Sequence, residues 1–190
     1  MRIIPDTLQS INNLALFYVR QGQYDPADPL YIKCFEKKST LGENHPDTLP
    51  SINNLALLYS TRLHYDKAHP LLIECLEKRK STLGENHPDT LLSINNLALL
   101  YSRQRQYDQA HPLFVECLEK LKSALGESHP VTLKFMNSLA MLYHKQGEYK
   151  KARSLREECR EKGGYKYESS CSTLPHGLKK SIKGQLQLIM

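Results

Sequence analysis

The residue types best suited to chemistry, cysteine and histidine, recur in this sequence at fixed positions. They are Cys34, Cys75, Cys117, Cys159, His45, His87, His129, His69 and His111. A zinc site needs converging ligands, commonly closely spaced Cys or His pairs, and the sequence contains no CxxC, HxxxH or HExxH. A catalytic triad needs one specific constellation, whereas these residues are spread evenly. We therefore expect no catalytic residue, no metal site and no cofactor, and we expect the histidines to cap helices or face solvent.

The four regularly spaced cysteines are predicted to be buried and unpaired. Adjacent helices pack about 8–10 Å apart, and equivalent residues of neighbouring repeats are two helices apart. A disulfide needs Cα atoms within roughly 7 Å, so bridges between these positions are not expected. Small buried hydrophobic side chains are the expected role. Cys171 is the one candidate for a reactive thiol. Free cysteines fit a reducing, intracellular compartment.

A tandem repeat of about 42 residues positions these side chains. The stretch LGENHPDTLPSINNLALLYS at 41–60 returns at 83–102 with only Pro50 changed, to Leu92. Four copies of the pattern begin at Pro5, Pro46, Pro88 and Pro130, with spacings of 41, 42 and 42 residues. A feature common to all copies therefore belongs first to the repeat architecture and only second to any unique site.

Each copy is predicted to begin with an amphipathic helix. In the second copy, Ile52, Leu55 and Tyr59 lie three or four residues apart, which places them on one helical face. Pro46 and Asp47 mark its start, because proline is favoured in a first turn and an acidic residue there suits the helix dipole.

A second helix is predicted to follow in each copy after a short turn. In the second copy it begins near Asp66 and carries Ala68, Leu72 and Cys75 on one face. Gly84 is the expected C-cap. Strand signals are absent, and short helices alternating at a fixed period predict an all-α fold, an α-solenoid.

Composition narrows the function further. Of 190 residues, 40 % are hydrophobic and 24 % charged, and the formal net charge is +6. No apolar run approaches the roughly 20 residues of a membrane span, and the N-terminus lacks the apolar stretch of a secretory signal, so a cytoplasmic location is expected. Lysines and arginines are mixed with glutamates, as in ECLEKRK, which argues against a nucleic-acid surface. We expect no stable membrane association either.

The paired helices resemble the tetratricopeptide repeat. The matching positions of the second copy are Leu55, Ala56, Tyr59, Tyr65, Ala68, Leu72 and Cys75. The long period, with LGENHPDT and NNLALLY, resembles the kinesin light chain and nephrocystin branch. The resemblance implies helix-turn-helix repeats in a right-handed superhelix, here as copies at 1–40, 41–82, 83–124 and 125–162. Two departures are that Leu63 and Arg105 replace the turn glycine of Gly22 and Gly147, and that Arg156 replaces an apolar residue.

Repeated asparagines are the candidate contact residues. They are Asn12, Asn13, Asn53, Asn54, Asn95, Asn96 and Asn137. A carboxamide both donates and accepts hydrogen bonds, so it can pair with an extended peptide of any sequence. The resemblance implies that first helices line a concave groove and that such asparagines hold a peptide backbone there. The alternative is that one Asn of each pair only bonds to a neighbouring repeat.

Other side chains suggest the nature of the ligand. Leu57, Leu99 and Met141 would form an apolar floor, and Arg103 and Lys145 would favour acidic groups. The sequence thus predicts a non-catalytic protein–protein interaction module, an adaptor or scaffold, that binds an acidic-apolar peptide or a partner helix. The alternative is a structural spacer, or an array that self-associates through exposed ends within a longer protein.

The segment 163–190 matches no repeat. It carries Lys166, Lys179, Lys180 and Lys183 against Glu168, a net charge of +3. The composition of YKYESSCSTLPHG is typical of disorder. The basic and then apolar LKKSIKGQLQLIM is expected to cover the last repeat, with weak binding to acidic membrane as the alternative.

Overall fold

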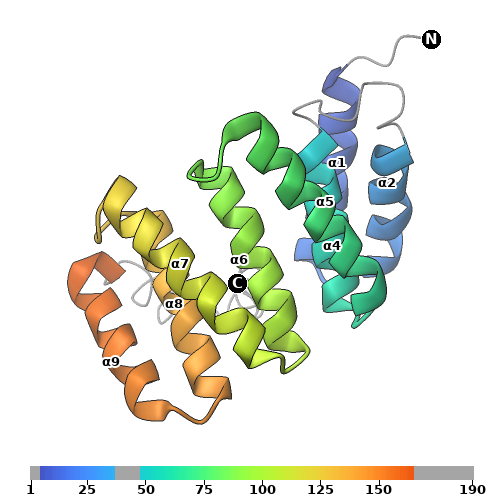
Figure 1. Cartoon of the computed structure of the whole chain (residues 1–190). Coiled ribbons are helices and arrows are strands. Elements are labelled where there is room, and N and C mark those ends of the chain that lie inside the picture. Colours follow the sequence, from blue (N-terminus) through green and yellow to red (C-terminus); the bar gives the residue numbers. More distant parts are fainter. Residues whose placement is uncertain (1–4, 37–47, 165–190) are drawn as a thin grey trace. The chain divides into compact units, whose positions relative to one another are not determined.

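The computed structural model describes residues 5–36 and 48–164, and within these ranges the chain forms α-helices and no strand (Figure 1). The helices are α1 Pro5–Arg20, α2 Tyr24–Glu36, α4 Thr48–Thr61, α5 Tyr65–Leu83, α6 Pro88–Arg103, α7 Tyr107–Leu125, α8 Pro130–Lys145 and α9 Tyr149–Cys159, followed by a π-helical turn, η1 Arg160–Gly164. The chain divides into two compact units, and the division falls inside α6 between Ser93 and Ile94.

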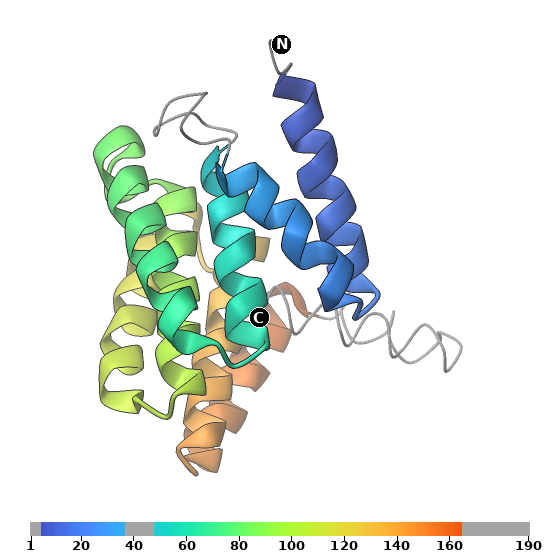
Figure 2. The ribbon, with the colours of Figure 1, turned by 90° about the vertical axis from the view of Figure 1, so that its right-hand side faces the viewer.

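The first unit is built on α2, which packs against both α1 and α4, while α4 also packs on α5 (Figure 2). Its main core cluster combines Ala15 and Val19 of α1, Ala27 and Tyr31 of α2, and Leu55 and Leu58 of α4. The small Ala15 and Ala27, both fully buried, let the paired helices approach closely. Tyr31 then fills the space between α2 and the first helix of the following pair.

The second unit repeats this arrangement. Helix α7 packs on α8, and α8 packs on α9. Phe114 of α7 is 1 % exposed and occupies the repeat position of Tyr31. Met136 and Leu142 of α8 are also fully buried. The same small-and-large pattern therefore produces the same helix packing in both units.

All four intra-repeat turns close with the same hydrogen bond. The N–H of Gln23 donates to the Tyr18 carbonyl, and the equivalent bonds at His64, Gln106 and Glu148 are also 2.9 Å long. This six-residue closure requires a left-handed residue just before the donor. Gly22 and Gly147 supply it at two turns, while at the other two Leu63 (φ 65°) and Arg105 (φ 62°) adopt the same conformation.

The linkers between repeats end and restart helices as the sequence predicts. Gly84 is the C-cap of α5, and its N–H donates to the Lys80 carbonyl at 3.0 Å. His129 is the N-cap of α8, where its Nδ1 accepts a hydrogen bond from the Val131 N–H at 3.2 Å. His87 accepts from the Asp89 N–H in the same way. The capping role predicted for linker histidines is thus observed at these two positions, whereas His45 lies outside the described residues.

The all-α repeat fold predicted from the sequence is confirmed for the described part of the chain. None of its helices is long and apolar enough to cross a membrane. The division into four repeats at 1–40, 41–82, 83–124 and 125–162 stays a prediction. The predictions for 163–190 concern residues almost wholly outside the described ranges.

Replacing Leu63 or Arg105 by glycine should stabilise the fold. A left-handed conformation costs a non-glycine residue roughly 1–2 kcal/mol, part of which the entropy of glycine offsets. Leu63 is 68 % exposed, so little packing is lost. We expect Leu63→Gly and Arg105→Gly each to raise the free energy of unfolding by about 1 kcal/mol, measured by urea denaturation. Gly147→Ala should lower it, and a loss of stability in both glycine variants would contradict this account.

Candidate functional site

The asparagines of the first unit form a short polar row across two repeats. The Nδ2 group of Asn54 on α4 donates to Oδ1 of Asn12 on α1 at 3.2 Å. Both side chains are half-buried, and Asn13 beside them is exposed. The contact joins first helices of successive repeats, which is the alternative role considered for one member of each pair. Each amide keeps further donor or acceptor capacity, so the row can still bind a ligand.

Three of the remaining asparagines are more enclosed. Asn53, Asn95 and Asn96 are 6 %, 2 % and 4 % exposed, and the Oδ1 atom of Asn95 has no hydrogen-bond partner among the described residues. Asn137 is half-buried, and its amide hydrogen-bonds to the Cys159 thiol. The structure thus makes Asn12, Asn13, Asn54 and Asn137 the accessible members of the predicted set.

Two of the three predicted apolar residues are partly accessible. Leu57 on α4 and Met141 on α8 are half-buried, whereas Leu99 on α6 is 9 % exposed. Partly exposed apolar side chains next to polar amides provide surface that a ligand could cover.

The predicted cations of the second unit lie close to each other. Lys145, at the end of α8, donates from Nζ to Oγ of Ser102 on α6 at 3.4 Å. Burial of the amine, and then the charge of the adjacent Arg103, lower the pKa of Lys145 below its ordinary value. No carboxylate of the described residues forms an ion pair with Lys145. An anionic group brought to this position would relieve the repulsion between the two cations.

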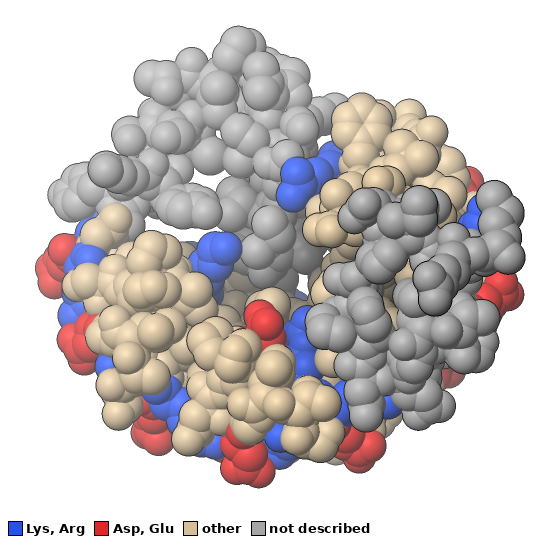
Figure 3. Space-filling model, turned by 90° about the horizontal axis from the view of Figure 1, so that it is seen from above, with Lys and Arg blue, Asp and Glu red and all other residues tan. Residues whose placement is uncertain are grey.

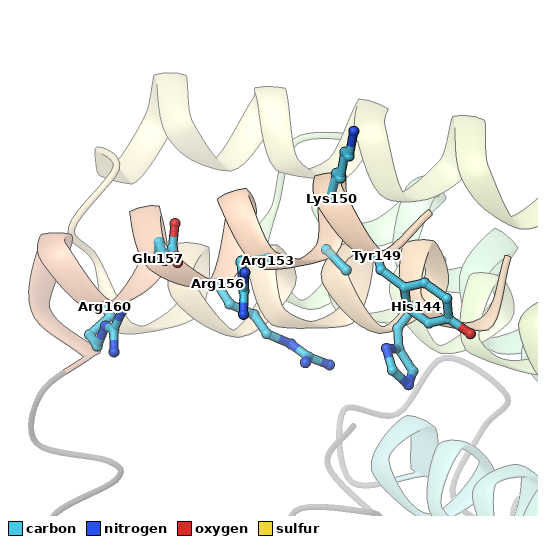
Figure 4. Close-up of a pocket in the computed structure, with 8 residues that line it drawn as sticks. His144, Tyr149, Lys150, Arg153, Arg156, Glu157 and Arg160 are labelled. Atoms are coloured by element: carbon cyan, nitrogen blue, oxygen red, sulfur yellow. The ribbon is translucent and has the colours of Figure 1, made fainter. Parts of the chain in front are cut away.

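A cationic hollow on α9 was not predicted. It has a volume of about 590 Å³ and is lined by His144, Tyr149, Lys150, Ala152, Arg153, Arg156, Glu157 and Arg160 (Figure 4). On the face of the molecule in Figure 3, by contrast, acidic and basic side chains of the described residues are interspersed. The sequence held two signals for this hollow, the replacement of an apolar residue by Arg156, noted above, and a second one by Arg160.

The repeated cysteines are buried and form no disulfide among the described residues, as the sequence predicts. The Sγ atoms of Cys34, Cys75 and Cys159 donate to the carbonyls of Leu8, Leu49 and Leu133 at 3.8, 3.7 and 3.6 Å, respectively. Each bond ties the second helix of a repeat to the start of the first. The thiols thus contribute to helix pairing.

Comparison with known protein families also identifies the helix pairs described above as repeats. Tetratricopeptide repeat models match residues 6–81, 90–131 and 132–162. The chain belongs to the tetratricopeptide repeat family. Repeats of this family generally mediate protein–protein interactions and are typically non-enzymatic. A comparison with curated proteins finds no match.

Solved structures of tetratricopeptide proteins support the predicted kinesin light chain-like branch. A protein of Podosopora anserina described as a putative kinesin light chain with nearly identical TPR-like repeats is 28 % identical in sequence. The match covers 86 % of this chain and 78 % of that one, with a TM-score of 0.67; a variant of that protein gives 0.71 over 86 % and 77 %. BtubC (BKLC) from P. vanneervenii, 21 % identical over 92 % of this chain and 69 % of that one, shares the fold with a TM-score of 0.72.

The tetratricopeptide packing should make Cys117 unreactive. Burial, and then the charge of Glu116, raise the pKa of the Cys117 thiol to about 12, so at pH 8 only about 10⁻⁴ of it is thiolate, the reactive form. We expect iodoacetamide to leave Cys117 unlabelled in the folded chain and to label it in urea, as read by mass spectrometry of tryptic peptides. Rapid labelling of Cys117 without denaturant would contradict the buried position.

Proposed function

We propose that this chain is a non-catalytic adaptor whose first helices, α1, α4, α6 and α8, bind an acidic, partly apolar peptide or partner helix. Membership of the tetratricopeptide family supports protein binding in general. We choose the first helices and an acidic ligand because of the side chains that the first helices of each unit carry.

The observation that carries this proposal is that two cations, Lys145 and Arg103, lie close together beside Ser102. The Lys145 side chain reaches solvent, and partial burial of its amine, together with the charge of Arg103, lowers its pKa. A carboxylate of a ligand would stabilise the charged form of Lys145 and offset the repulsion from Arg103. A neutral or basic ligand would have no such gain.

In the first unit, amide and apolar groups supply the complementary contacts. Exposed Asn13 and the bonded pair Asn12 and Asn54 can pair with a peptide backbone, because amides offer donors and acceptors. Half-buried Leu57 can be covered by an apolar ligand side chain. The free thiols of the repeats are consistent with action in a reducing compartment, for which we propose the cytoplasm.

A second candidate function, self-association, is favoured by the exposed apolar face of α1. Leu14 and Phe17 are 45 % and 54 % exposed, while their repeat equivalents, Leu55 and Leu58, are buried in the core of the first unit. Two copies could cover these faces by packing α1 against α1. The Leu14→Ser/Phe17→Ser variant should then sediment as a monomer where the parent dimerises, and a parent that is monomeric at 100 µM, about the weakest relevant affinity, would exclude this function.

Reversing the charge of Lys145 should abolish selection of acidic ligands. We expect the parent chain to enrich acidic-apolar sequences from a random peptide library, and Lys145→Glu to bind the enriched peptides about tenfold more weakly. Because Lys145 loses its proton as the pH rises through its lowered pKa, parental affinity should also fall as the pH is raised from neutral into the alkaline range. Fluorescence anisotropy measures both effects.

The matched control is Lys33→Glu, which reverses an exposed charge on α2 away from the first helices. It should bind like the parent, and all three proteins should give the same thermal melt. Enrichment of basic or neutral peptides, or equal binding by Lys145→Glu and the parent, would contradict the proposed function.

A further inference from the structure

The outer face of α9 differs in chemistry from the same face of the other second helices. At three repeat positions, α9 carries Arg153, Arg156 and Arg160. The position of Arg156 holds Tyr31, Leu72 and Phe114 in the other copies, and that of Arg160 holds Phe35, Leu76 and Leu118. Of these six, five are buried and Phe35 is half-buried, whereas Arg153, Arg156 and Arg160 are all exposed.

In α2 and α7, this face receives the first helix of the next repeat. Tyr31 packs in the cluster that includes Leu55 and Leu58 of α4. Phe35 packs against the cluster that contains Leu49 and Ile52 of α4. The position of Arg153 is also a docking position, because the equivalent His111 hydrogen-bonds to Tyr143 of α8 at 3.1 Å. The arginines of α9 thus occupy contact positions.

The cations of this face have no partners in the described part of the chain. No ion pair or hydrogen bond there involves the side chains of Lys150, Arg153, Arg156 or Arg160. Lysines elsewhere on or near α9 are paired: Lys151 with Glu148 at 2.5 Å, and Lys162 with Glu158 at 2.6 Å. The three unpaired arginines therefore gather on one face of α9, and the paired lysines lie outside it.

The close-up shows how these groups are disposed. Arg156 extends to the same side of α9 as His144, whereas Lys150 and Glu157 point to the opposite side in this view (Figure 4). His144 and Tyr149 make an edge-to-face ring contact with centroids 5.1 Å apart at one end of the hollow. Tyr149 is 63 % exposed. The hollow thus combines guanidinium groups with an exposed aromatic edge.

We propose that the cationic face of α9 is a second docking site, separate from the first-helix surface, and that it binds an acidic helical segment of a partner protein. The partner helix would take the place that the next first helix takes on α2 and α7. Its carboxylates would pair with Arg153, Arg156 and Arg160, and an apolar side chain would contact Tyr149.

Charge and spacing favour this occupant over others. The chain's own segment after Gly164 carries a net charge of +3 and would be repelled. A further copy of this repeat would place an apolar first helix against three arginines. Arg153, Arg156 and Arg160 follow a spacing of three and four residues on one helical face, which spans about 10 Å at 1.5 Å per residue. Carboxylates at the same spacing on a second helix can face all three. Glu157, within the lining, disfavours dense polyanions such as nucleic acid.

The test uses the full chain and a fluorescein-labelled helical peptide with Glu at three positions spaced three and four residues apart. A control peptide has Gln at these positions. We expect the parent to bind the Glu peptide at least about tenfold more tightly than the Gln peptide at low salt, with affinity falling as salt rises. Arg156→Glu/Arg160→Glu should weaken binding of the Glu peptide about tenfold.

The matched control, Lys33→Glu/Lys80→Glu, makes the same change in net charge at exposed positions of α2 and α5 and should bind like the parent. Loss of Glu-peptide binding in Lys145→Glu, with the arginine variants binding like the parent, would instead place the peptide on the first-helix surface and overturn this assignment. If Arg156→Glu/Arg160→Glu melts at a lower temperature than the parent, the uncharged variant Arg156→Gln/Arg160→Gln is compared with the parent in its place.

Three further results would overturn the proposal. Equal binding of the Glu peptide by the parent and by both arginine variants would show that the arginines only keep this face soluble. Equal binding of the Glu and Gln peptides would remove the role of the carboxylates. Tighter, arginine-dependent binding of single-stranded RNA or of vesicles containing phosphatidylserine would assign the face to a different class of partner.

Discussion

The structure depends on one contact, the insertion of a large side chain from a second helix against the first helix that follows it, as Tyr31 of α2 packs against α4. Tyr31, Leu72 and Phe114 occupy this position and are all essentially inaccessible to solvent. Burying a side chain of this size contributes roughly 1.5–3 kcal/mol, and the same position is repeated along the chain. Alanines such as Ala27 and Ala110, also fully buried, allow the helices to come close enough for the insertion.

This contact also determines which surfaces are left for binding. Because the second helices hold the repeats together, the first helices are left to present Asn12, Asn13 and Leu57, and in the other unit Lys145 and Arg103. The same contact position carries Arg156 on α9, so that helix is chemically unsuited to receive another copy of the repeat. We therefore propose two sources of binding capacity: side chains that packing does not require, and contact positions where the apolar residue has been replaced.

The sequence predicted most of the fold because each repeat shows the same apolar spacing and the same proline and glycine positions. Helix starts, the Gly84 cap and the buried cysteines all followed from apolar spacing and from proline and glycine positions. The left-handed Leu63 and Arg105 could be anticipated only by alignment with Gly22 and Gly147, since their own residue types do not favour that conformation.

The candidate site was predicted less completely. A helical wheel gives the direction in which Asn53 or Asn95 leaves its own helix, but burial depends on how closely other helices approach. Both amides are buried, as are Asn96 and Leu99. The α9 hollow could not be found from any single motif, because lysine and arginine are common on exposed helix faces. Only the comparison of Arg156 and Arg160 with their apolar equivalents, together with their lack of partners among the described residues, distinguishes it.

We propose that the first helices form the ligand-binding surface. NMR of the asparagine side-chain amides can test this during titration with an acidic-apolar peptide selected from a library. We expect saturable shifts of the Asn13 and Asn54 NH₂ resonances, with the resonance of Asn86 in the linker after α5 unchanged. Saturable binding that leaves the Asn13 and Asn54 resonances in place, with shifts confined to residues of α9, would contradict it.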